Sequence, residues 1–290
     1  MHKAGFVNII GNPNVGKSTL MNALVGEKLS IITSKAQTTR HRILGIVNGD
    51  DFQVVYSDTP GILKPNYKLQ ESMMGFVRDA LSDADIFLVV IDATEKAGPD
   101  PNTIEKIKKS KIPIIVVLNK TDVADGEKQM KLVELWSKEI PGADIVPVSA
   151  LKGTNVDRVM DLIMKFLPEH PAYYDKEEIT DRNERFFVAE IIREKILKNY
   201  QKEIPYSAQV VVEEFKEEPH IIKMRAVIYI ERESQKAIIL GHQGSMIKKT
   251  GTEARLSIEH FLGKKIFLDL FVKVDKDWRN NEAKLKKFGY

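Results

Sequence analysis

The stretch "FVNIIGNPNVGKST", residues 6–19, passes from an apolar run into a glycine-rich turn and then into a helix-like segment. It contains the pattern G-x-x-x-x-G-K-S from Gly11 to Ser18. Glycines let backbone N–H groups surround phosphates, Lys17 can reach the β/γ oxygens, and the Ser18 hydroxyl suits Mg²⁺. The stretch predicts a nucleoside triphosphate site and leaves adenine and guanine open. The predicted binding residues are Gly11, Asn12, Asn14, Val15, Gly16, Lys17, Ser18 and Thr19.

Short β-branched apolar runs alternate with amphipathic stretches up to about residue 167; they are "FVNII", "FQVVYS", "DIFLVVID", "IPIIVVLN" and "DIVPVS". Near-continuous apolar strands are typical of a mainly parallel sheet covered on both faces, as in α/β folds. Prolines and mixed charges break the pattern over residues 167–185. We therefore predict a P-loop domain over residues 1–170, a linker over 171–184 and a second domain over 185–290.

The composition excludes several classes of protein. The chain has no cysteine, which excludes disulfides, thiolate metal sites and cysteine nucleophiles. Its start lacks a signal-peptide pattern, and its apolar runs are far shorter than the ~20 residues of a membrane span. We therefore expect a cytoplasmic protein. Residues 1–176 carry 22 basic and 22 acidic side chains, whereas residues 236–290 carry 12 and 6, an excess of +6 that favours an anionic partner.

The segment Asn119-Lys-Thr-Asp122 follows the apolar run "IIVVL" and indicates which base is bound. The Asp122 carboxylate can accept from the guanine N1–H and exocyclic amine together, a donor pair that adenine lacks. Asn119 can donate to the carbonyl edge of guanine, and the stem of Lys120 can lie against the ring. Backbone N–H groups of Ser149, Ala150 and Leu151, after the next strand, can meet the guanine oxygen. The order of these segments favours GTP over ATP.

A carboxylate at a strand end points to a metal site. Asp58-Thr59-Pro60-Gly61 follows "FQVVYS", so Asp58 can hold Mg²⁺ and the Gly61 N–H can meet the γ-phosphate. The segment "QTTRHR", residues 37–42, offers hydroxyls for the same ion; we favour Thr39, with Thr38 as the alternative. The predicted metal ligands are Ser18, Thr39 and Asp58. The predicted catalytic residues are Lys17, Thr39, Asp58 and Gly61, and Thr59 and Pro60 are predicted nucleotide contacts.

Together these segments resemble the five motifs of translation-factor-related small GTPases. The resemblance implies Mg²⁺-dependent hydrolysis of GTP to GDP and two switch segments, near residues 32–45 and 59–75. Many such proteins orient the attacking water with a glutamine after the glycine of this motif, but Ile62 cannot form a hydrogen bond to water, so we expect slow intrinsic hydrolysis. Asn14 resembles the position that helps to hold K⁺ in potassium-stimulated relatives; the alternative is that Asn14 only stabilises the loop.

The second domain contains a G-x-x-G segment, Gly241-His242-Gln243-Gly244, which is weak evidence alone. It lies in the order helix, strand, strand, helix, G-x-x-G, helix, strand, which matches a type II KH domain, whose glycine loop clamps about four nucleotides. We predict a smaller α+β KH domain. The predicted RNA-binding residues are Lys236, Gly241, His242, Gln243, Gly244, Lys248 and Lys249. A KH-like fold used for protein contacts is the alternative. The aromatic residues Phe267, Phe271, Trp278 and Phe288 mostly fit a core.

A P-loop GTPase followed by a type II KH domain resembles, over essentially the whole chain, bacterial GTPases of ribosome assembly. The resemblance implies a GTP-controlled factor that binds 16S ribosomal RNA near its 3′ end, assists maturation of the small ribosomal subunit and contacts the membrane peripherally. We expect a monomer. A second hypothesis is a regulatory GTPase whose C-terminal module is a protein or membrane adaptor. An RNA-modifying enzyme is disfavoured because no further catalytic cluster lies outside the P-loop domain.

Overall fold

The computed structural model describes residues 1–95 and 98–290 and contains two compact units. The first unit comprises residues 1–65 and 70–181, and the second comprises residues 66–69 and 182–290. Each unit has its own sheet and its own buried apolar cluster. In the part of the chain that the structure describes, no helix is both long enough and apolar enough to cross a bilayer.

The first unit is built on a six-stranded sheet with the strand order β2-β3-β1-β4-β5-β6. All neighbouring strands are parallel except β2 and β3, which confirms the predicted mainly parallel sheet. The antiparallel edge strand β2, whose first residues fall in the predicted first switch segment, was not predicted from the sequence. The strands are β1 (Lys3–Ile10), β2 (Ile43–Asn48), β3 (Phe52–Asp58), β4 (Ile86–Asp92), β5 (Ile114–Asn119) and β6 (Asp144–Pro147).

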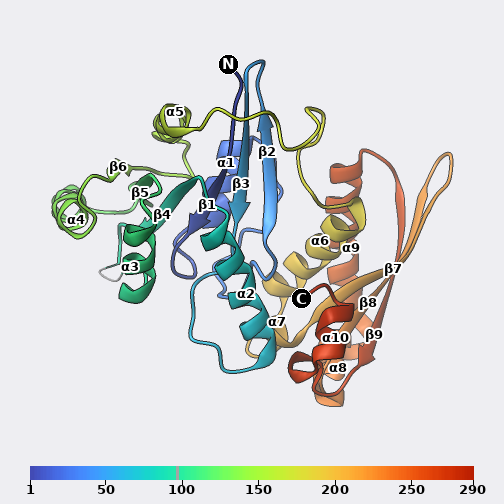
Figure 1. Cartoon of the computed structure of the whole chain (residues 1–290). Helices are drawn as coiled ribbons and strands as arrows, with labels where there is room; N and C mark the ends of the chain where they lie inside the picture. Colours follow the sequence, from blue (N-terminus) through green and yellow to red (C-terminus); the bar gives the residue numbers. More distant parts are fainter. Residues whose placement is uncertain (96–97) are drawn as a thin grey trace. The chain divides into compact units, whose positions relative to one another are not determined.

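Helices lie on both faces of this sheet, as Figure 1 shows. Every residue of β4 is buried, which explains why its sequence is continuously apolar instead of alternating. On one face, Ile104 and Trp136 belong to a cluster with Phe87 and Val89 of β4. The helices are α1 (Lys17–Val25), α2 (Lys68–Ser82), α3 (Pro101–Ser110), α4 (Gly126–Glu139) and α5 (Val156–Phe166).

Parallel pairing brings the carboxyl ends of β1, β3, β4 and β5 to one edge of the sheet. The register pairs Ile9 with Asp58 and Asp92 with Asn119. Strand β1 lies between β3 and β4, and the chain leaves β1 into the glycine-rich turn. Open α/β sheets bind ligands at such an edge, so the fold gathers the predicted nucleotide motifs at one place.

The segment predicted as a linker packs on the first unit over much of its length. The backbone N–H groups of Tyr173 and Tyr174 donate to Gln53 Oε1 at 2.7 and 3.0 Å, and Gln53 is completely buried. The Ile46 N–H donates to the Ile179 carbonyl at 2.9 Å. The first unit therefore continues to residue 181.

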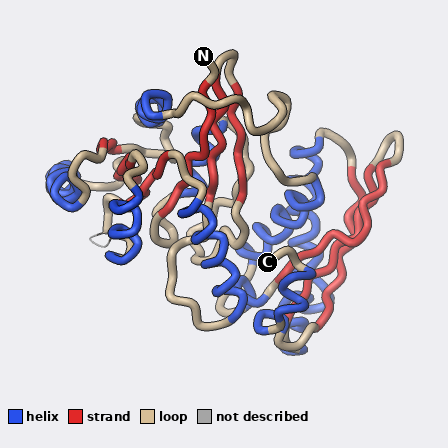
Figure 2. The backbone as a smooth tube through the Cα atoms, in the orientation of Figure 1, coloured by secondary structure: helices blue, strands red, loops and turns tan. Residues whose placement is uncertain are grey.

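The second unit is a two-layer arrangement in which α6 and α9 pack on one face of a three-stranded sheet (Figure 2). The sheet has the order β7-β8-β9, with β7 antiparallel and β9 parallel to β8. The predicted α-β-β-α-α-β order is confirmed, and short helices are added to it. The elements are α6 (Glu184–Asn199), α7 (Ile204–Ser207), β7 (Gln209–Glu217), β8 (Ile222–Ile230), α8 (Glu233–Leu240), η1 (His242–Gly244), α9 (Ser245–Leu262), β9 (Ile266–Val274), η2 (Trp278–Asn280) and α10 (Glu282–Lys287).

The prediction that most aromatic residues of this unit lie in the core is wrong for two of them. Phe267 and Phe271 are 57% and 47% exposed. Successive side chains of a strand point to opposite faces, and the residues of β9 that join the core are the alternate ones, from Ile266 to Val274. Trp278, by contrast, is completely buried and donates its indole N–H to the Ser207 carbonyl at 3.0 Å.

Candidate functional site

The glycine-rich turn after β1 delivers Lys17 to the first position of α1. Lys17 is only 6% exposed, and its Nζ donates to the carbonyls of Gly11 and Asn12 at 3.1 and 2.9 Å. Burial lowers the pKa of Lys17 to about 8, which the charge of Asp58 partly opposes. A phosphate beside Lys17 would supply the negative charge that favours its protonated form.

Three oxygen-bearing side chains converge next to this lysine. Ser18 Oγ donates to Asp58 Oδ2 at 2.7 Å, and Thr39 Oγ1 lies 2.9 Å from Ser18 Oγ and 3.3 Å from Asp58 Oδ2. Asp58 is completely buried, and burial raises its pKa against the opposing effects of the Ser18 hydrogen bond and Lys17. Hard oxygen donors with one carboxylate are the ligands that Mg²⁺ prefers, so these residues fit this ion.

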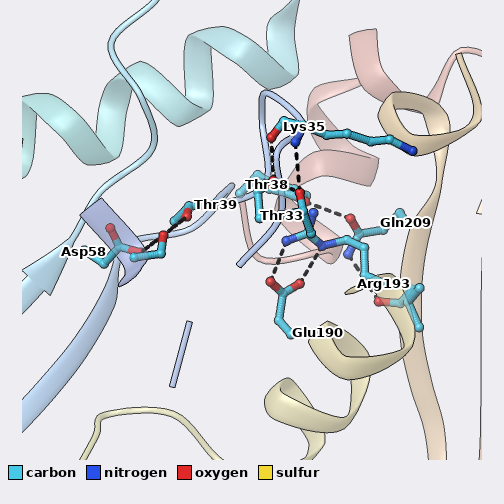
Figure 3. Close-up of polar contacts among 11 residues, drawn as sticks. Thr33, Lys35, Thr38, Thr39, Asp58, Glu190, Arg193 and Gln209 are labelled. Atoms are coloured by element: carbon cyan, nitrogen blue, oxygen red, sulfur yellow. Dashed lines mark hydrogen bonds and ion pairs between the residues drawn. The ribbon is translucent and has the colours of Figure 1, made fainter. Parts of the chain in front are cut away.

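Thr38 and Thr39 point to different surroundings, as Figure 3 shows. Thr39 is directed at Asp58. Thr38 Oγ1 donates to the Lys35 carbonyl at 2.6 Å and lies 2.6 Å from Thr33 Oγ1. The structure therefore brings Thr39, the residue favoured from the sequence, to the predicted metal ligands and turns Thr38 into a local loop contact.

The side chain of Asn119, at the end of β5, joins two loops. Its Nδ2 donates to the Val15 carbonyl at 2.9 Å, and its Oδ1 accepts from the Ala150 N–H at 3.0 Å. Asn119 is 2% exposed. It therefore holds the glycine-rich turn against the 149–151 loop, a positioning role that the sequence did not reveal. Asp122, the residue predicted to read the base, is fixed by Ser149, whose Oγ donates to Asp122 Oδ1 at 2.6 Å.

Asp92, at the end of β4, lies beside the predicted base motif and was not predicted from the sequence. Its Oδ2 forms an ion pair with Lys120 Nζ at 2.5 Å, and its Oδ1 accepts from the backbone N–H and hydroxyl of Thr94 at 2.8 and 2.6 Å. Although burial acts to raise the pKa of Asp92, the contacts from Lys120 and Thr94 leave that pKa below its usual value. Its signal in the sequence was an acidic residue closing the apolar run "IFLVVID" at the same sheet edge.

A cavity of about 460 Å³ lies among these residues, and its lining includes Lys17, Thr39 and Asp122. Several predicted residues support the cavity without lining it; for example, Thr59 donates its hydroxyl to the Ile9 carbonyl at 2.8 Å. The lining also includes residues 32–34, which lie in the predicted first switch segment but were not predicted as contacts, and Ile31 and Val123, for which no motif gave a signal. The cavity is lined by Pro13, Asn14, Gly16, Lys17, Ser18, Thr19, Ile31, Ile32, Thr33, Ser34, Gln37, Thr38, Thr39, Gly61, Asn119, Lys120, Asp122, Val123 and Leu151.

The 59–62 segment is held against the glycine-rich turn. The Ile62 N–H donates to the Gly11 carbonyl at 3.2 Å. A Cβ on Gly61 would lie 2.7 Å from the backbone of Pro13, so a larger residue at position 61 would separate the two segments. The predicted γ-phosphate contact at Gly61 therefore sits beside the predicted phosphate loop.

In the second unit, the GHQG loop connects α8 to α9. Gly241 has φ 69° and ψ 179°, a conformation essentially restricted to glycine, and its Cβ would lie 2.8 Å from Met246 Cβ. Gly244 has φ 77°, and the N-terminus of α9 follows it. His242 and Gln243 are exposed, as are Lys248 and Lys249 on the first turns of α9, whereas Lys236 on α8 is half-buried. The glycine loop thus lies next to the exposed cationic side chains of α9.

Known proteins match both units. A family described as 50S ribosome-binding GTPase matches residues 6–120, and a KH domain family matches residues 203–279. GTPase Era of Clostridium perfringens is 45% identical over 100% of this chain and 99% of its own length, and that of Staphylococcus haemolyticus is 44% identical over 100% and 97%. The chain belongs to the Era family of GTPases.

Solved Era structures agree with this assignment. One, Era in complex with MgGDPNP and nucleotides 1506–1542 of 16S ribosomal RNA, is 40% identical, covers 100% of this chain and 99% of its own, and has a TM-score of 0.95. A variant of Aquifex aeolicus Era bound to GDP.AlF4⁻ has the same identity and TM-score, with 99% coverage of both chains. As an Era-family member the chain is a GTPase, with a P-loop GTPase fold and a KH domain.

Proposed function

We propose that this GTPase is a molecular switch that binds 16S ribosomal RNA near its 3′ end and assists maturation of the small ribosomal subunit. The observation that carries the proposal is the Era relative of TM-score 0.95, which matches the whole chain in complex with MgGDPNP and that RNA. The family that matches residues 6–120 is described as 50S ribosome-binding GTPase, which names the large ribosomal subunit instead of the small one. That match stops before the GHQG loop, so we take the RNA target from the relative that covers both units.

The roles of the nucleotide-site residues follow from their contacts. Lys17 would neutralise the β- and γ-phosphates, and Gly61 would donate its N–H to the γ-phosphate. Ser18, Thr39 and Asp58 would hold Mg²⁺, which supplies positive charge against the phosphate oxygens as the terminal bond breaks. Asp122, held by Ser149, would accept from the guanine N–H groups, and Lys120, held by Asp92, would cover the ring.

Hydrolysis lacks the usual water-orienting amide because Ile62 occupies that position. We therefore propose slow intrinsic hydrolysis of GTP and its acceleration by K⁺ near Asn14, which lines the cavity and has φ 64°. Hydrolysis rates measured in equal concentrations of KCl and NaCl test the ion. Equal rates in both salts would reduce Asn14 to a residue that stabilises the loop.

The proposed RNA site consists of the backbone of the GHQG loop with Lys236, Lys248 and Lys249. If the basic C-terminal part neutralises roughly four to six phosphates, log affinity for single-stranded RNA falls against log salt with a slope of about −3 to −4. The double variant Lys248→Gln/Lys249→Gln should make that slope shallower by about 1.4. Footprinting on 16S ribosomal RNA with a GTP analogue, with GDP and without nucleotide tests the ligand, the target and their coupling together.

The second hypothesis, an adaptor for protein or membrane, predicts different results. An adaptor would not protect the RNA in footprinting, and its measured affinity for RNA would not change with salt.

We further propose a cytoplasmic monomer whose basic C-terminal end, which has a charge of +6 over residues 236–290, contacts anionic membrane surfaces peripherally. Sedimentation of the full chain with and without anionic vesicles measures both properties.

A further inference from the structure

Tyr200, which directly follows α6, connects the two helices that flank the GHQG loop. Its hydroxyl donates to the Ile239 carbonyl at 2.9 Å and accepts from Thr250 Oγ1 at 3.1 Å. Ile239 lies in the last turn of α8, and Thr250 lies in the second turn of α9. The chain of donors begins one residue earlier, where Asn199 Nδ2 donates to Thr250 Oγ1 at 3.3 Å.

This network is buried and supplies a donor to a carbonyl at the end of α8. Tyr200 is 3% exposed, and Ile239 and Thr250 are completely buried. Carbonyls in the last turn of a helix have no partner within the helix, so the Tyr200 hydroxyl replaces the donor that Ile239 lacks. Burial raises the pKa of Tyr200. The hydroxyl therefore keeps its proton and remains a donor at physiological pH.

The loop between the two helices needs such support because its conformation is uncommon and one of its residues is strained. Gly241 and Gly244 have φ values of 69° and 77°, which glycine adopts without steric cost, whereas Gln243 has φ 49°, which costs free energy for a residue with a side chain. Strained residues persist when the surrounding structure fixes them. The exposed side chains of His242 and Gln243 contribute no buried packing, so support must come from the ends of α8 and α9.

We propose that Tyr200 is a positioning residue for RNA binding: its hydroxyl ties the end of α8 to α9 and so holds the GHQG loop in its binding conformation. The proposal rests on the proposed function of that loop. A loop fixed before binding loses less conformational entropy when RNA orders it, so the network strengthens binding without touching RNA.

The test compares the full chain with its Tyr200→Phe variant, using the fragment of nucleotides 1506–1542 of 16S ribosomal RNA. We expect a loss of affinity of roughly five- to tenfold, the effect of one buried hydrogen bond. The slope of log affinity against log salt should stay unchanged because no phosphate contact is removed. In the protein without RNA, amide hydrogen exchange at Gly241 and Gly244 should become faster.

Trp278→Phe is the matched control, because it too removes one buried hydrogen bond from an aromatic side chain to a backbone carbonyl of the same unit. It should lower stability and leave RNA affinity unchanged. Thr250→Ser, which keeps the hydroxyl, should bind RNA as the wild type does, whereas Thr250→Val should weaken binding. The double variant Tyr200→Phe/Thr250→Val should lose no more RNA affinity than the single variant with the larger loss, because both substitutions break the same network.

Wild-type affinity in Tyr200→Phe would overturn the proposal, as would an equal loss in Trp278→Phe. If the wild-type chain itself binds no RNA, the proposed function fails instead. The exchange rates at Gly241 and Gly244 then decide separately whether Tyr200 holds the loop, and unchanged rates refute that role.

Discussion

Asn119 and Asp122 belong to one four-residue motif, yet their side chains make different contacts. Both ends of the Asn119 amide are occupied by the loops at residues 15 and 150, whereas Asp122 lines the cavity and has a single described side-chain contact, from Ser149. Although both residues line the cavity, we therefore propose that base recognition rests mainly on Asp122 and that Asn119 acts by holding the surrounding loops.

Replacing Asp122 by asparagine should change the preferred base. The amide cannot accept from both guanine N–H groups, so GTP affinity should fall by about 3 kcal/mol, or roughly 100-fold. Xanthine carries a carbonyl where guanine has its amine, so affinity for XTP should rise. Competition binding with GTP and XTP measures both changes. Asp125→Asn, at an exposed acidic residue nearby, is the control, and an unchanged GTP preference in Asp122→Asn would contradict the assignment.

Replacing Asp92 by asparagine should loosen the nucleotide without abolishing binding. The substitution removes the charge that holds Lys120 but keeps an acceptor for Thr94. Lys120 is about one-third exposed, so the loss should be near 1 kcal/mol, seen as a roughly fivefold faster dissociation of fluorescent GDP. The control is Asp144→Asn, which breaks the solvent-exposed pair with Lys165. Equal dissociation rates in Asp92→Asn and the wild type would refute a role for Asp92.

At the scale of elements, the two glycines of the GHQG loop are not equivalent. A Cβ on Gly241 would lie 2.8 Å from Met246 Cβ and 3.0 Å from its backbone nitrogen, whereas a Cβ on Gly244 meets no atom within 4 Å. The second glycine is thus required by its backbone angle alone, and the first by both its angles and its surroundings.

Alanine substitutions should separate these two constraints. Gly244→Ala should cost about 1–2 kcal/mol of stability, the penalty of a left-handed residue, while Gly241→Ala should cost about 3 kcal/mol and displace the start of α9. Thermal unfolding of the full chain and RNA affinity measure the two effects. Gly251→Ala, in the following helix α9 and without a positive φ, is a control for the added methyl group, which would meet only the end of the Leu270 side chain, at 3.2 Å. Equal losses of stability in Gly241→Ala and Gly244→Ala would show that the contact with Met246 is unimportant.

The sequence predicted the elements whose pattern is strong and local. Buried parallel strands and the helices of the second unit have clear periodicity, and the phosphate and base motifs lie at strand ends in a fixed order. The edge strand β2 was not predicted because its first residues fall in the predicted first switch segment. It also pairs with only one neighbour, β3. Asp92 and Tyr200 were missed because their partners, Lys120 and Ile239, are 28 and 39 residues away, and only the folded register brings them together.

At the scale of the whole molecule, the chain combines a nearly neutral nucleotide-binding part with a basic C-terminal part. Residues 1–176 have no net charge, whereas residues 236–290 carry +6. The proposed RNA site lies in the basic part, so salt should weaken the proposed RNA binding strongly. Nucleotide binding depends instead on buried groups such as Lys17 and should be less sensitive to salt.

If the molecule is a switch, the two ligands must affect each other by the same factor. A coupling of 1–3 kcal/mol, typical of such systems, would make RNA bind roughly 5- to 150-fold tighter with a non-hydrolysable GTP analogue than with GDP. By linkage, RNA must shift the preference of the protein for the analogue over GDP by the same factor. Titrations of RNA at saturating nucleotide, and of each nucleotide at saturating RNA, measure both sides of the cycle.

The double variant Gly241→Asp/Gly244→Asp provides the control for this coupling. It places negative charge where RNA phosphates would lie and, as argued for alanine, also disturbs the loop backbone. RNA binding should therefore be lost, while the affinities for GTP analogue and GDP, whose site lies in the first unit, stay at their wild-type values. In that variant, added RNA should no longer change nucleotide affinity. Equal RNA affinity in the GTP and GDP states of the wild-type chain would leave a GTPase that binds RNA but does not switch.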